Sequence, residues 1–209
     1  MMPRLEVNPE RWIRLPTVDS SNSYAMREAL PSGSVVLAGK QTAGRGSMGR
    51  TWQSEPGSVI FTGVLEFDAG IVPDDRLPLF AILAGVAVMR AASAIVPGEY
   101  RIKEPNDVLV LRGGPGKIAG VLVESEITAE KRRVFIGIGI NVSTAPPPMD
   151  SIYPPAPLIS PAQSRAGISV STEHCARLLV LEINARLDQM TGPEMPAFLG
   201  EAAEFRLSA

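Results

Sequence analysis

Cysteine and histidine are almost absent from this chain of 209 residues, and their scarcity excludes several kinds of chemistry. The single cysteine, Cys175, cannot form a disulfide within the chain and is typical of a protein from a reducing compartment. The single histidine, His174, is its neighbour, and adjacent side chains on a helix point about 100° apart. We therefore exclude a Cys–His pair, a histidine-based triad and a zinc site, and expect a polar first-turn residue beside a buried thiol.

An excess of positive charge is also lacking. Lysine and arginine number 20 against 22 aspartate and glutamate residues, for a net charge of −2. Without a lysine-rich run, we expect no nucleic acid and no anionic membrane as a main partner. The longest apolar run, residues 77–89, is too short to span a membrane and predicts a buried helix. Residues 1–15 contain scattered charges and no apolar signal-peptide core, so we expect a cytoplasmic location.

Hydrophobic residues make up 45% of the chain, which is enough for one ample core in one catalytic domain. Helical spacing or helix-forming composition marks residues 24–30, 77–96 and 173–190. The segments predicted as strands are rich in β-branched and apolar residues: 34–40, 58–67, 107–112, 118–127 and 134–142. We expect the last two to form an antiparallel hairpin. The pattern predicts an α+β fold with a mixed central β-sheet flanked by helices. The proline-rich residues 145–161 read as a connection rather than a recognition motif.

Two glycine-rich segments fit nucleotide-binding patterns only superficially. Gly44, Gly46 and Gly49 satisfy G-x-G-x-x-G, but a loop entering a strand follows them where a dinucleotide fold requires a helix. Residues 113–118 resemble a P-loop, but Lys117 is followed by an isoleucine, so the metal-binding hydroxyl is missing. Neither reading holds.

The first glycine-rich segment nevertheless predicts a site for a small anion. Lys40, Arg45 and Arg50 all precede the next acidic residue, Glu55. Glycines allow backbone N–H groups to come close to an anion, and arginine supplies a fork of donors for phosphate or carboxylate. Further polar residues stand in or beside the apolar strands, and each one alone is also compatible with a structural role: Gln41, Asn106, Asp107, Lys117 and Asn141.

Four motifs follow one another along the chain in a fixed order. They are Gly44-Arg45-Gly46 with Arg50-Thr51-Trp52, then Lys103 with Pro105-Asn106-Asp107, then Gly116-Lys117-Ile118-Ala119-Gly120-Val121-Leu122-Val123-Glu124, and then Gly137-Ile138-Gly139-Ile140-Asn141. Asp19-Ser20-Ser21-Asn22 precedes them as a helix start. In order and spacing, over residues 15–145, the chain resembles the biotin–protein ligases. Their motifs are Gly-Arg-Gly-Arg-x-x-Arg-x-Trp, Lys-Trp-Pro-Asn-Asp, Gly-(Arg)-Lys-x-x-Gly-x-Leu-x-Glu and Gly-x-Gly-x-Asn.

The resemblance implies a catalytic domain of the biotin/lipoate ligase type, which is similar to that of class II aminoacyl-tRNA synthetases. It implies two steps, in which ATP and biotin form biotinyl-5′-adenylate with Mg²⁺, and a lysine of a biotin carboxyl-carrier protein then takes the biotinyl group. Members of the family often form homodimers, and the sequence leaves the oligomeric state open. Fewer than twenty residues precede Ser20, so we expect the monofunctional form without a DNA-binding domain. We expect the catalytic domain over residues 1–195 and the start of a shortened small domain over 196–209.

The resemblance also assigns residues. Lys117 and Arg45 would be catalytic, with Lys117 between the carboxylate and the α-phosphate. The resemblance places biotin against Ser20, Ser21, Asn22, Gln41, Gly44, Arg45, Gly46, Ser47, Lys117 and Gly120. It places the nucleotide against Arg50, Trp52, Lys103, Asn106, Asp107 and Asn141, with Asp107 also as the metal ligand.

Two residues depart from the family's motifs. Ser47 stands where the family has a second arginine, and loss of a charge-assisted contact of roughly 1.5–3 kcal/mol predicts faster leakage of the adenylate. Glu104 replaces the motif tryptophan, and it could bind metal, pair with Lys103 or reduce activity. These departures keep two alternatives open, a lipoate or octanoate ligase or transferase on the same fold and a catalytically weakened biotin-binding module.

Overall fold

The computed structural model describes residues 5–8, 10–147, 152–192 and 194–207. Within this part of the chain, seven strands form one sheet in the order β1-β2-β3-β7-β6-β5-β4. Only the pair β1–β2 is parallel, and every other neighbouring pair is antiparallel, which confirms the predicted mixed sheet. The strands are β1 Trp12–Leu15, β2 Val35–Ala38, β3 Ser58–Asp68, β4 Tyr100–Lys103, β5 Asp107–Val110, β6 Gly116–Ile127 and β7 Lys131–Asn141.

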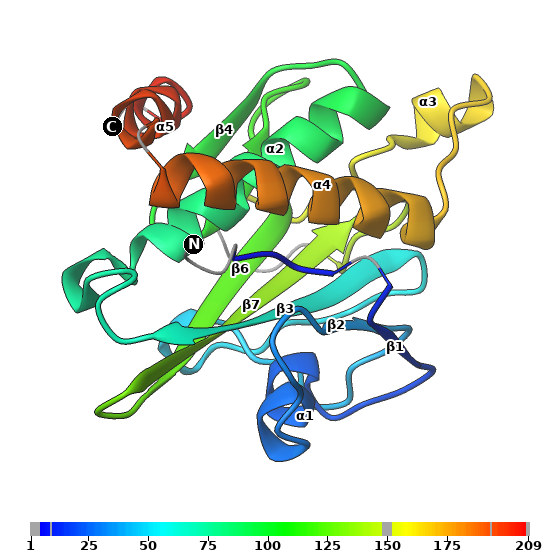
Figure 1. Ribbon diagram of the computed structural model, residues 1–209. Coiled ribbons are helices and arrows are strands. Elements are labelled where there is room, and N and C mark those ends of the chain that lie inside the picture. The colour runs from blue at the N-terminus through cyan, green and yellow to red at the C-terminus, as the bar shows by residue number, and fades with distance from the viewer. Residues whose placement is uncertain (1–4, 9, 148–151, 193, 208–209) are drawn as a thin grey trace.

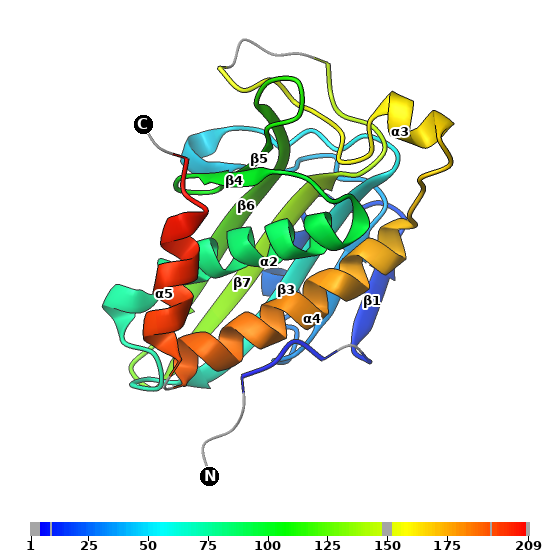
Figure 2. The same ribbon diagram turned by 90° about the horizontal axis from the view of Figure 1, so that it is seen from above.

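The helices cover the two faces of this sheet unequally. Figures 1 and 2 show α2 and α4 lying side by side across one face, with α5 at their end, while α1 lies alone on the opposite face. A larger core therefore forms under α2 and α4 than under α1. The helices are α1 Ser21–Arg27, α2 Leu79–Ile95, α3 Pro161–Arg165, α4 Thr172–Thr191 and α5 Met195–Glu204.

Helix α2 confirms the prediction of a buried helix for the longest apolar run. By length and composition, residues 74–95 could cross a membrane. In the fold, however, Phe80, Leu83 and Val86 of this helix are fully buried among the strands and α4. Burial of such side chains contributes roughly 1.5–3 kcal/mol each, so the apolar composition is accounted for by the core.

The pair His174–Cys175 also lies as predicted. Ser171 caps α4 by accepting a hydrogen bond from the backbone N–H of His174 at 3.1 Å, so His174 is an exposed residue of the first turn. Cys175 is 1% exposed, and burial raises the pKa of its thiol to about 12. Because the thiolate is the nucleophilic form, this cysteine is chemically inert in the folded protein.

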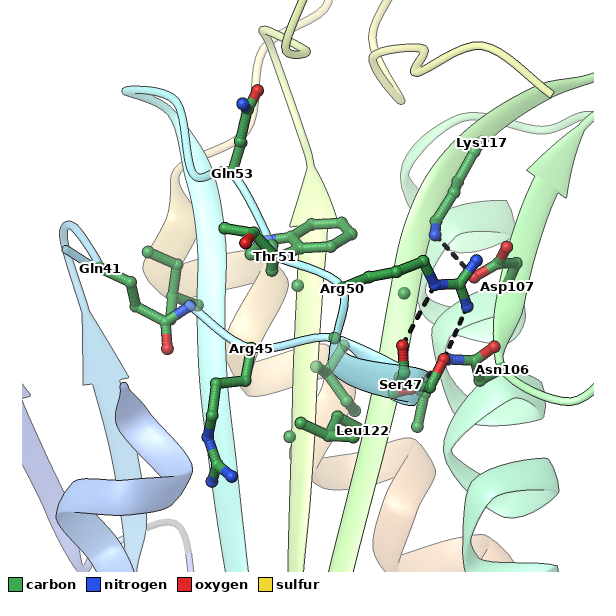
Figure 3. Close-up of a pocket in the computed structure, with 18 of the residues that line it drawn as sticks. Gln41, Arg45, Ser47, Arg50, Thr51, Gln53, Asn106, Asp107, Lys117 and Leu122 are labelled. Atoms are coloured by element: carbon green, nitrogen blue, oxygen red, sulfur yellow. Dashed lines mark hydrogen bonds and ion pairs between the residues drawn. The ribbon is translucent and has the colours of Figure 1, made fainter. Parts of the chain in front are cut away.

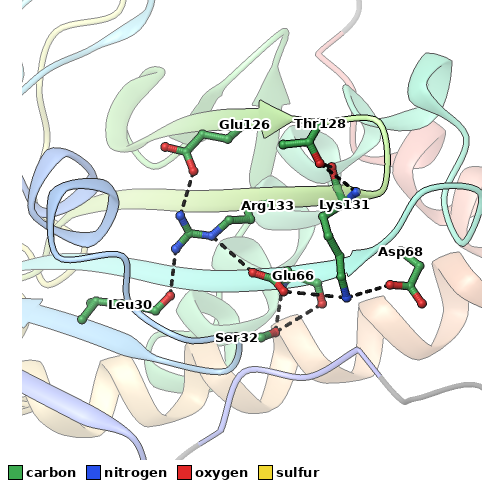
Figure 4. Close-up of polar contacts among 8 residues, drawn as sticks. All are labelled: Leu30, Ser32, Glu66, Asp68, Glu126, Thr128, Lys131 and Arg133. Carbon is green, nitrogen blue, oxygen red and sulfur yellow. Dashed lines mark hydrogen bonds and ion pairs between the residues drawn. The ribbon is translucent and has the colours of Figure 1, made fainter.

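The predicted hairpin is formed by β6 and β7, and its far end is strongly charged. The backbone N–H of Lys131 donates to Thr128 Oγ1 at 2.9 Å in the turn. Arg133 lies on β7, between Glu66 on the neighbouring strand β3 and Glu126 on the neighbouring strand β6. It forms ion pairs with both carboxylates. Figure 4 shows these pairs, together with the pairing of Lys131 with Asp68. Ion pairs between neighbouring strands therefore link β3, β6 and β7 at this end of the sheet.

The described part of residues 196–209 packs on the same domain. Phe198 and Ala202 of α5 belong to the main core. Beyond the helix, the backbone N–H of Leu207 donates to Ile102 O of β4 at 2.9 Å, and the N–H of Ile102 donates to Phe205 O at 2.7 Å. The segment therefore adds a short strand-like edge to β4. Whether a further small domain begins here stays a prediction.

Candidate functional site

A pocket of about 420 Å³ lies on the face of the sheet that α1 shares. Its floor comes from β3, β7, β6 and β5, and the loop between β2 and β3 forms a wall (Figure 3). Its volume falls within the range of small-molecule sites, roughly 300–1,000 Å³. Most of the site residues predicted from the sequence line this pocket: Ser20, Ser21, Asn22, Gln41, Arg45, Gly46, Ser47, Arg50, Trp52, Asn106, Asp107, Lys117, Gly120 and Asn141.

Two residues predicted for the site do not line this pocket. Gly44 belongs to the loop that forms the wall, and a Cβ atom there would come within 2.4 Å of Trp52 O, so its role is to let the loop turn back on itself. Lys103 ends β4, near the edge of the sheet, and is not among the lining residues. Glu104 beside it forms an ion pair with Arg206 at 2.7 Å rather than with Lys103.

A β-bulge brings Lys117 onto the pocket face. On β5 and β6, Val108 pairs with Ala119 but Leu109 pairs with Lys117, so Ile118 has no partner on β5. This extra residue reverses the alternation of side chains, and Lys117 therefore points to the same face as Gly120. There its Nζ lies 2.7 Å from Asp107 Oδ1 and 5.6 Å from the centroid of the Trp52 ring. The cation is held between a carboxylate and an aromatic face.

Glycines in the floor make room for two side chains that lie flat on the sheet. A Cβ atom on Gly139 would come within 2.3 Å of Trp52 Cε2, and one on Gly120 within 2.9 Å of Trp52 Cζ3. A Cβ atom on Gly137 would come within 2.6 Å of Asn22 Oδ1. Gly120 and Gly139 are cross-strand partners, so the tryptophan ring rests on a bare patch of backbone. The Gly-x-Gly-x-Asn motif thus seats one ring and one amide.

Hydrogen bonds join α1 to the sheet at the other end of the pocket. Ser20, within the predicted helix start, caps the helix by accepting from the backbone N–H of Ser23. Thr62 of β3 is fully buried and lies 2.8 Å from Ser21 Oγ and 2.7 Å from Asn22 Oδ1. The backbone N–H of Ser21 donates to Gln41 Oε1 at 2.8 Å. The hydroxyl and amide groups at this end of the pocket are therefore held in one fixed arrangement.

Arg45 lies away from Lys117 in this arrangement. Its Nη2 donates to Glu124 Oε2 at 2.7 Å, and Figure 3 shows its side chain directed away from Lys117 and Asp107. The two residues predicted to be catalytic thus line the same pocket at separate places. The cation that accompanies Lys117 on its side of the pocket is Arg50 (Figure 3).

Ser47 links the wall of the pocket to the turn before β5. Its Oγ accepts hydrogen bonds from Arg50 Nη2 at 2.7 Å and from Asn106 Nδ2 at 3.0 Å. Asn106 Nδ2 also donates to Val121 O on β6 at 2.9 Å. The serine that replaces the family's second arginine therefore has a defined place as an acceptor for two neighbouring donors.

Sequence reasoning missed several residues of the site. Thr62 has a detectable signal, because it is a lone hydroxyl in the middle of an apolar strand. The proline-rich segment also contributes, since Tyr153 and Pro155 line the pocket. Its backbone follows the start of β6, where the N–H of Lys117 donates to Pro154 O at 2.8 Å. The described residues of this segment thus connect β7 to α3, as predicted, and they also contribute to the pocket, while residues 148–151 lie outside the described residues.

The carboxylates that could hold a metal are few. Among the described residues, no three His, Cys, Asp or Glu side chains gather as a metal site. Asp107 is the one acidic residue among the described residues that line the pocket. One carboxylate suits Mg²⁺, which takes one or two protein carboxylates together with water and substrate phosphates. The donor set therefore fits a magnesium ion that arrives with a nucleotide.

Comparison with known proteins identifies relatives of this chain. A model of the biotin/lipoate A/B protein ligase family matches residues 15–141. The biotin–[acetyl-CoA-carboxylase] ligase of Paracoccus denitrificans is 36% identical over 173 residues, which cover 79% of this chain and 68% of that protein. The bifunctional ligase/repressor BirA of Bacillus spizizenii is 40% identical over 115 residues, which cover 54% of this chain. The matched segment spans about a third of the length of the BirA proteins from two Bacillus species, 34% in each.

Solved structures share the fold. The biotin protein ligase of Aquifex aeolicus in complex with biotin and ATP superposes with a TM-score of 0.76 at 24% identity, over 95% of this chain and 79% of that one. The biotin protein ligase of Leishmania major in complex with biotin gives a TM-score of 0.77 at 24% identity, over 96% and 82%. The predicted fold class is thereby confirmed.

Proposed function

The chain belongs to the biotin/lipoate A/B protein ligase family, and on this premise we propose that it activates biotin with ATP and transfers it to a lysine of a biotin carboxyl-carrier protein. One observation carries the proposal. A single pocket holds the Lys117–Asp107 pair on β6 and β5 and, across the sheet, the hydroxyl and amide groups of Ser21 and Asn22. Such a pocket suits a ligand with an anionic end and a polar ring.

In the first step, a carboxylate oxygen of biotin attacks the α-phosphorus of ATP and pyrophosphate leaves. Two anions must approach each other, so a fixed cation between them lowers the barrier by offsetting the charge that they share. Lys117 is suited to this place because Asp107 and Trp52 hold its ammonium group. No covalent intermediate with the protein is needed, and positioning together with electrostatics supplies the catalysis.

In the second step, the amine of the acceptor lysine attacks the carbonyl carbon of the mixed anhydride and AMP leaves. The task of this chain is to keep the anhydride from water until the carrier arrives. The loop that contains Ser47 and Arg50 stands over the pocket and is joined to Asn106 across it, which suits this task.

The polar end of the pocket suits the ureido ring of biotin. Asn22 Nδ2 donates both of its protons to protein groups, Leu122 O and Glu124 Oε2. Its Oδ1 faces Thr62 and keeps a second lone pair, which can accept from a ring N–H. The dithiolane ring of lipoate has no such donor, so these partners favour biotin.

We further propose that Mg²⁺ binds with the nucleotide, where Asp107 supplies one oxygen and the metal neutralises phosphate charge. Asn106 and Asn141 line the same region of the pocket and would contact the nucleotide. A cytoplasmic location, where ATP and carboxylases are available, also remains part of the proposal. The proposal includes no nucleic-acid or membrane partner, because the chain has a net charge of −2 and no lysine-rich run.

The proposal is tested by exchange of labelled pyrophosphate into ATP in the presence of different acids. Exchange that depends on biotin is the expected result, with little exchange in the presence of lipoate or octanoate. Exchange with lipoate or octanoate alone would assign the chain to a different acid. Binding of biotin without any exchange would identify a module that has lost catalysis.

Ser47 sets how firmly the adenylate is retained. We expect Ser47→Arg to slow the release of biotinyl-adenylate about ten- to a hundredfold, because it adds a charge-assisted contact to the phosphate. The measurement is the dissociation rate of the labelled intermediate after gel filtration. Met48→Arg is the matched control, since it adds the same charge at a neighbouring side chain that is 83% exposed and does not line the pocket. Equal release rates in Ser47→Arg and the unmodified protein would contradict this assignment.

A further inference from the structure

Glu124 joins two parts of the site that are far apart in the sequence. It lies on β6 beyond Leu122, on the pocket face, and its side chain is 24% exposed. One oxygen, Oε2, accepts from Asn22 Nδ2 at 2.9 Å and from Arg45 Nη2 at 2.7 Å. Asn22 belongs to α1, whereas Arg45 belongs to the loop that forms the wall of the pocket. A single carboxylate thus contacts both.

Residues 45–50 of the wall have few other attachments. In the described part of the chain, two polar side-chain contacts tie residues 45–50 to the sheet or its turns: Arg45 to Glu124 and Ser47 to Asn106. The remaining hydrogen bonds of this segment are internal, such as the N–H of Gly46 to Arg50 O at 2.7 Å. Loss of the contact at Glu124 would therefore remove one of the two side-chain contacts that hold residues 45–50.

Asn22, by contrast, has little freedom. It is 3% exposed, it rests on the bare backbone of Gly137, and its amide is held by Thr62, Leu122 and Glu124. A ligand that hydrogen-bonds to the Asn22 amide would polarise and fix this amide, which donates to the same Glu124 oxygen as Arg45. The position of the amide and the position of the loop are coupled through that shared oxygen.

We propose that Glu124 is a positioning residue that couples occupation of the polar end of the pocket to the anchoring of the loop over it. The identity of the ligand rests on the proposed function, whereas the coupling of loop and amide does not. Without the carboxylate, Arg45 loses its partner and Asn22 loses one of its two acceptors. A ligand bound at the polar end then no longer affects how firmly the loop is held.

Trypsin provides a test that does not depend on activity, because it cleaves after Arg45 and Arg50. In the unmodified protein we expect slow cleavage at these two bonds and further protection by biotin. In Glu124→Ala we expect cleavage at these bonds at least tenfold faster, and biotin should no longer restore full protection. Mass spectrometry distinguishes these cuts from cuts at other exposed arginines, which should be unchanged.

Ligand affinity gives the second readout. We expect the dissociation constant for biotin to rise about ten- to a hundredfold in Glu124→Ala, while the KM for ATP changes less than threefold. Glu124→Gln keeps an uncharged acceptor for Asn22 and removes the charge that holds Arg45. It should therefore loosen the loop while retaining much of the biotin affinity. If Glu124→Ala fails to fold, Glu124→Gln supplies the same comparison.

Glu126→Ala is the matched control. Glu126 lies two residues further along the same face of β6 and pairs with Arg133 at 2.8 Å instead of with the loop. Cleavage at Arg45 and Arg50 and biotin affinity should be unchanged in this variant. In Arg45→Ala, cleavage after Arg50 should already be fast, and adding Glu124→Ala should accelerate it no further.

The outcomes separate this inference from the proposed function. If the protein binds no biotin, the proposed function is refuted. Cleavage of the ligand-free variants still tests whether Glu124 holds the loop through Arg45. Cleavage of ligand-free Glu124→Ala at the rate of the unmodified protein would overturn the inference. So would full protection of Glu124→Ala by biotin in a protein that binds it.

Discussion

Replacement of Lys117 by alanine is expected to lower the rate of biotinyl-adenylate formation by about a hundred- to a thousandfold. That range is typical for removal of one fixed group that offsets charge in a transition state. The bulge at Ile118 turns Lys117 toward the pocket, and Asp107 holds its Nζ at 2.7 Å. No other lysine lines the described part of the pocket, so no neighbouring lysine can take over its place. The measurement is biotin-dependent exchange of pyrophosphate into ATP under saturating substrates.

Two further variants separate chemistry from folding. Lys117→Ala also leaves Asp107, which is 7% exposed, without its cation, and an unpaired buried charge costs stability. Lys117→Arg keeps a positive charge beside Asp107 and should retain the fold while losing much of the rate, because its guanidinium is larger and differently placed. Lys131→Ala removes a lysine at the far end of the sheet, where it pairs with Asp68, and should leave exchange unchanged. Full activity in Lys117→Ala would refute the proposed mechanism.

The long elements of the fold were predictable from sequence because their pattern is local. Strands β3, β6 and β7 and helices α2 and α4 repeat apolar residues over ten or more positions. Strands β1 and β4 were missed. Each has four residues, and charged residues such as Arg14 and Arg101 interrupt their apolar pattern. Their extended form comes from pairing with β2 and β5, and no window of the sequence contains that information.

The sequence motifs predicted which residues belong to the candidate site, but not how these residues contact one another. The motifs named most of the polar side chains that line the pocket, but they did not say which ones meet. Arg45 pairs with Glu124 and Glu104 pairs with Arg206, over separations of 79 and 102 positions, and these meetings depend on strand order. The bulge that turns Lys117 toward Asp107 was equally hidden, since spacing in the sequence does not show which residue lacks a partner.

Replacement of Gly139 by alanine is expected to abolish biotin binding while the protein stays folded. A Cβ atom there would lie 2.3 Å from Trp52 Cε2 and 2.5 Å from Cζ2, a distance that no side chain tolerates. The backbone of β7 is fixed by β3 and β6 on both sides, so the ring must move instead, upward into the pocket. Such overpacking costs about 1–3 kcal/mol of unfolding free energy, and the raised ring fills the space of the ligand. Calorimetric titration with biotin measures the loss, and thermal unfolding verifies the fold.

A graded series of glycines distinguishes this steric effect from a general loss of glycine. Gly120→Ala meets the same ring at 2.9 Å and should weaken binding less than Gly139→Ala, because a smaller tilt of Trp52 relieves it. Gly200→Ala adds a methyl group with no atom within 4 Å in α5 and should leave binding unchanged. Trp52→Leu combined with Gly139→Ala should cost less stability than the two single changes added together, since the clash needs the indole ring. If the two costs simply add, or if Gly139→Ala binds biotin normally, the glycine does not seat the ring.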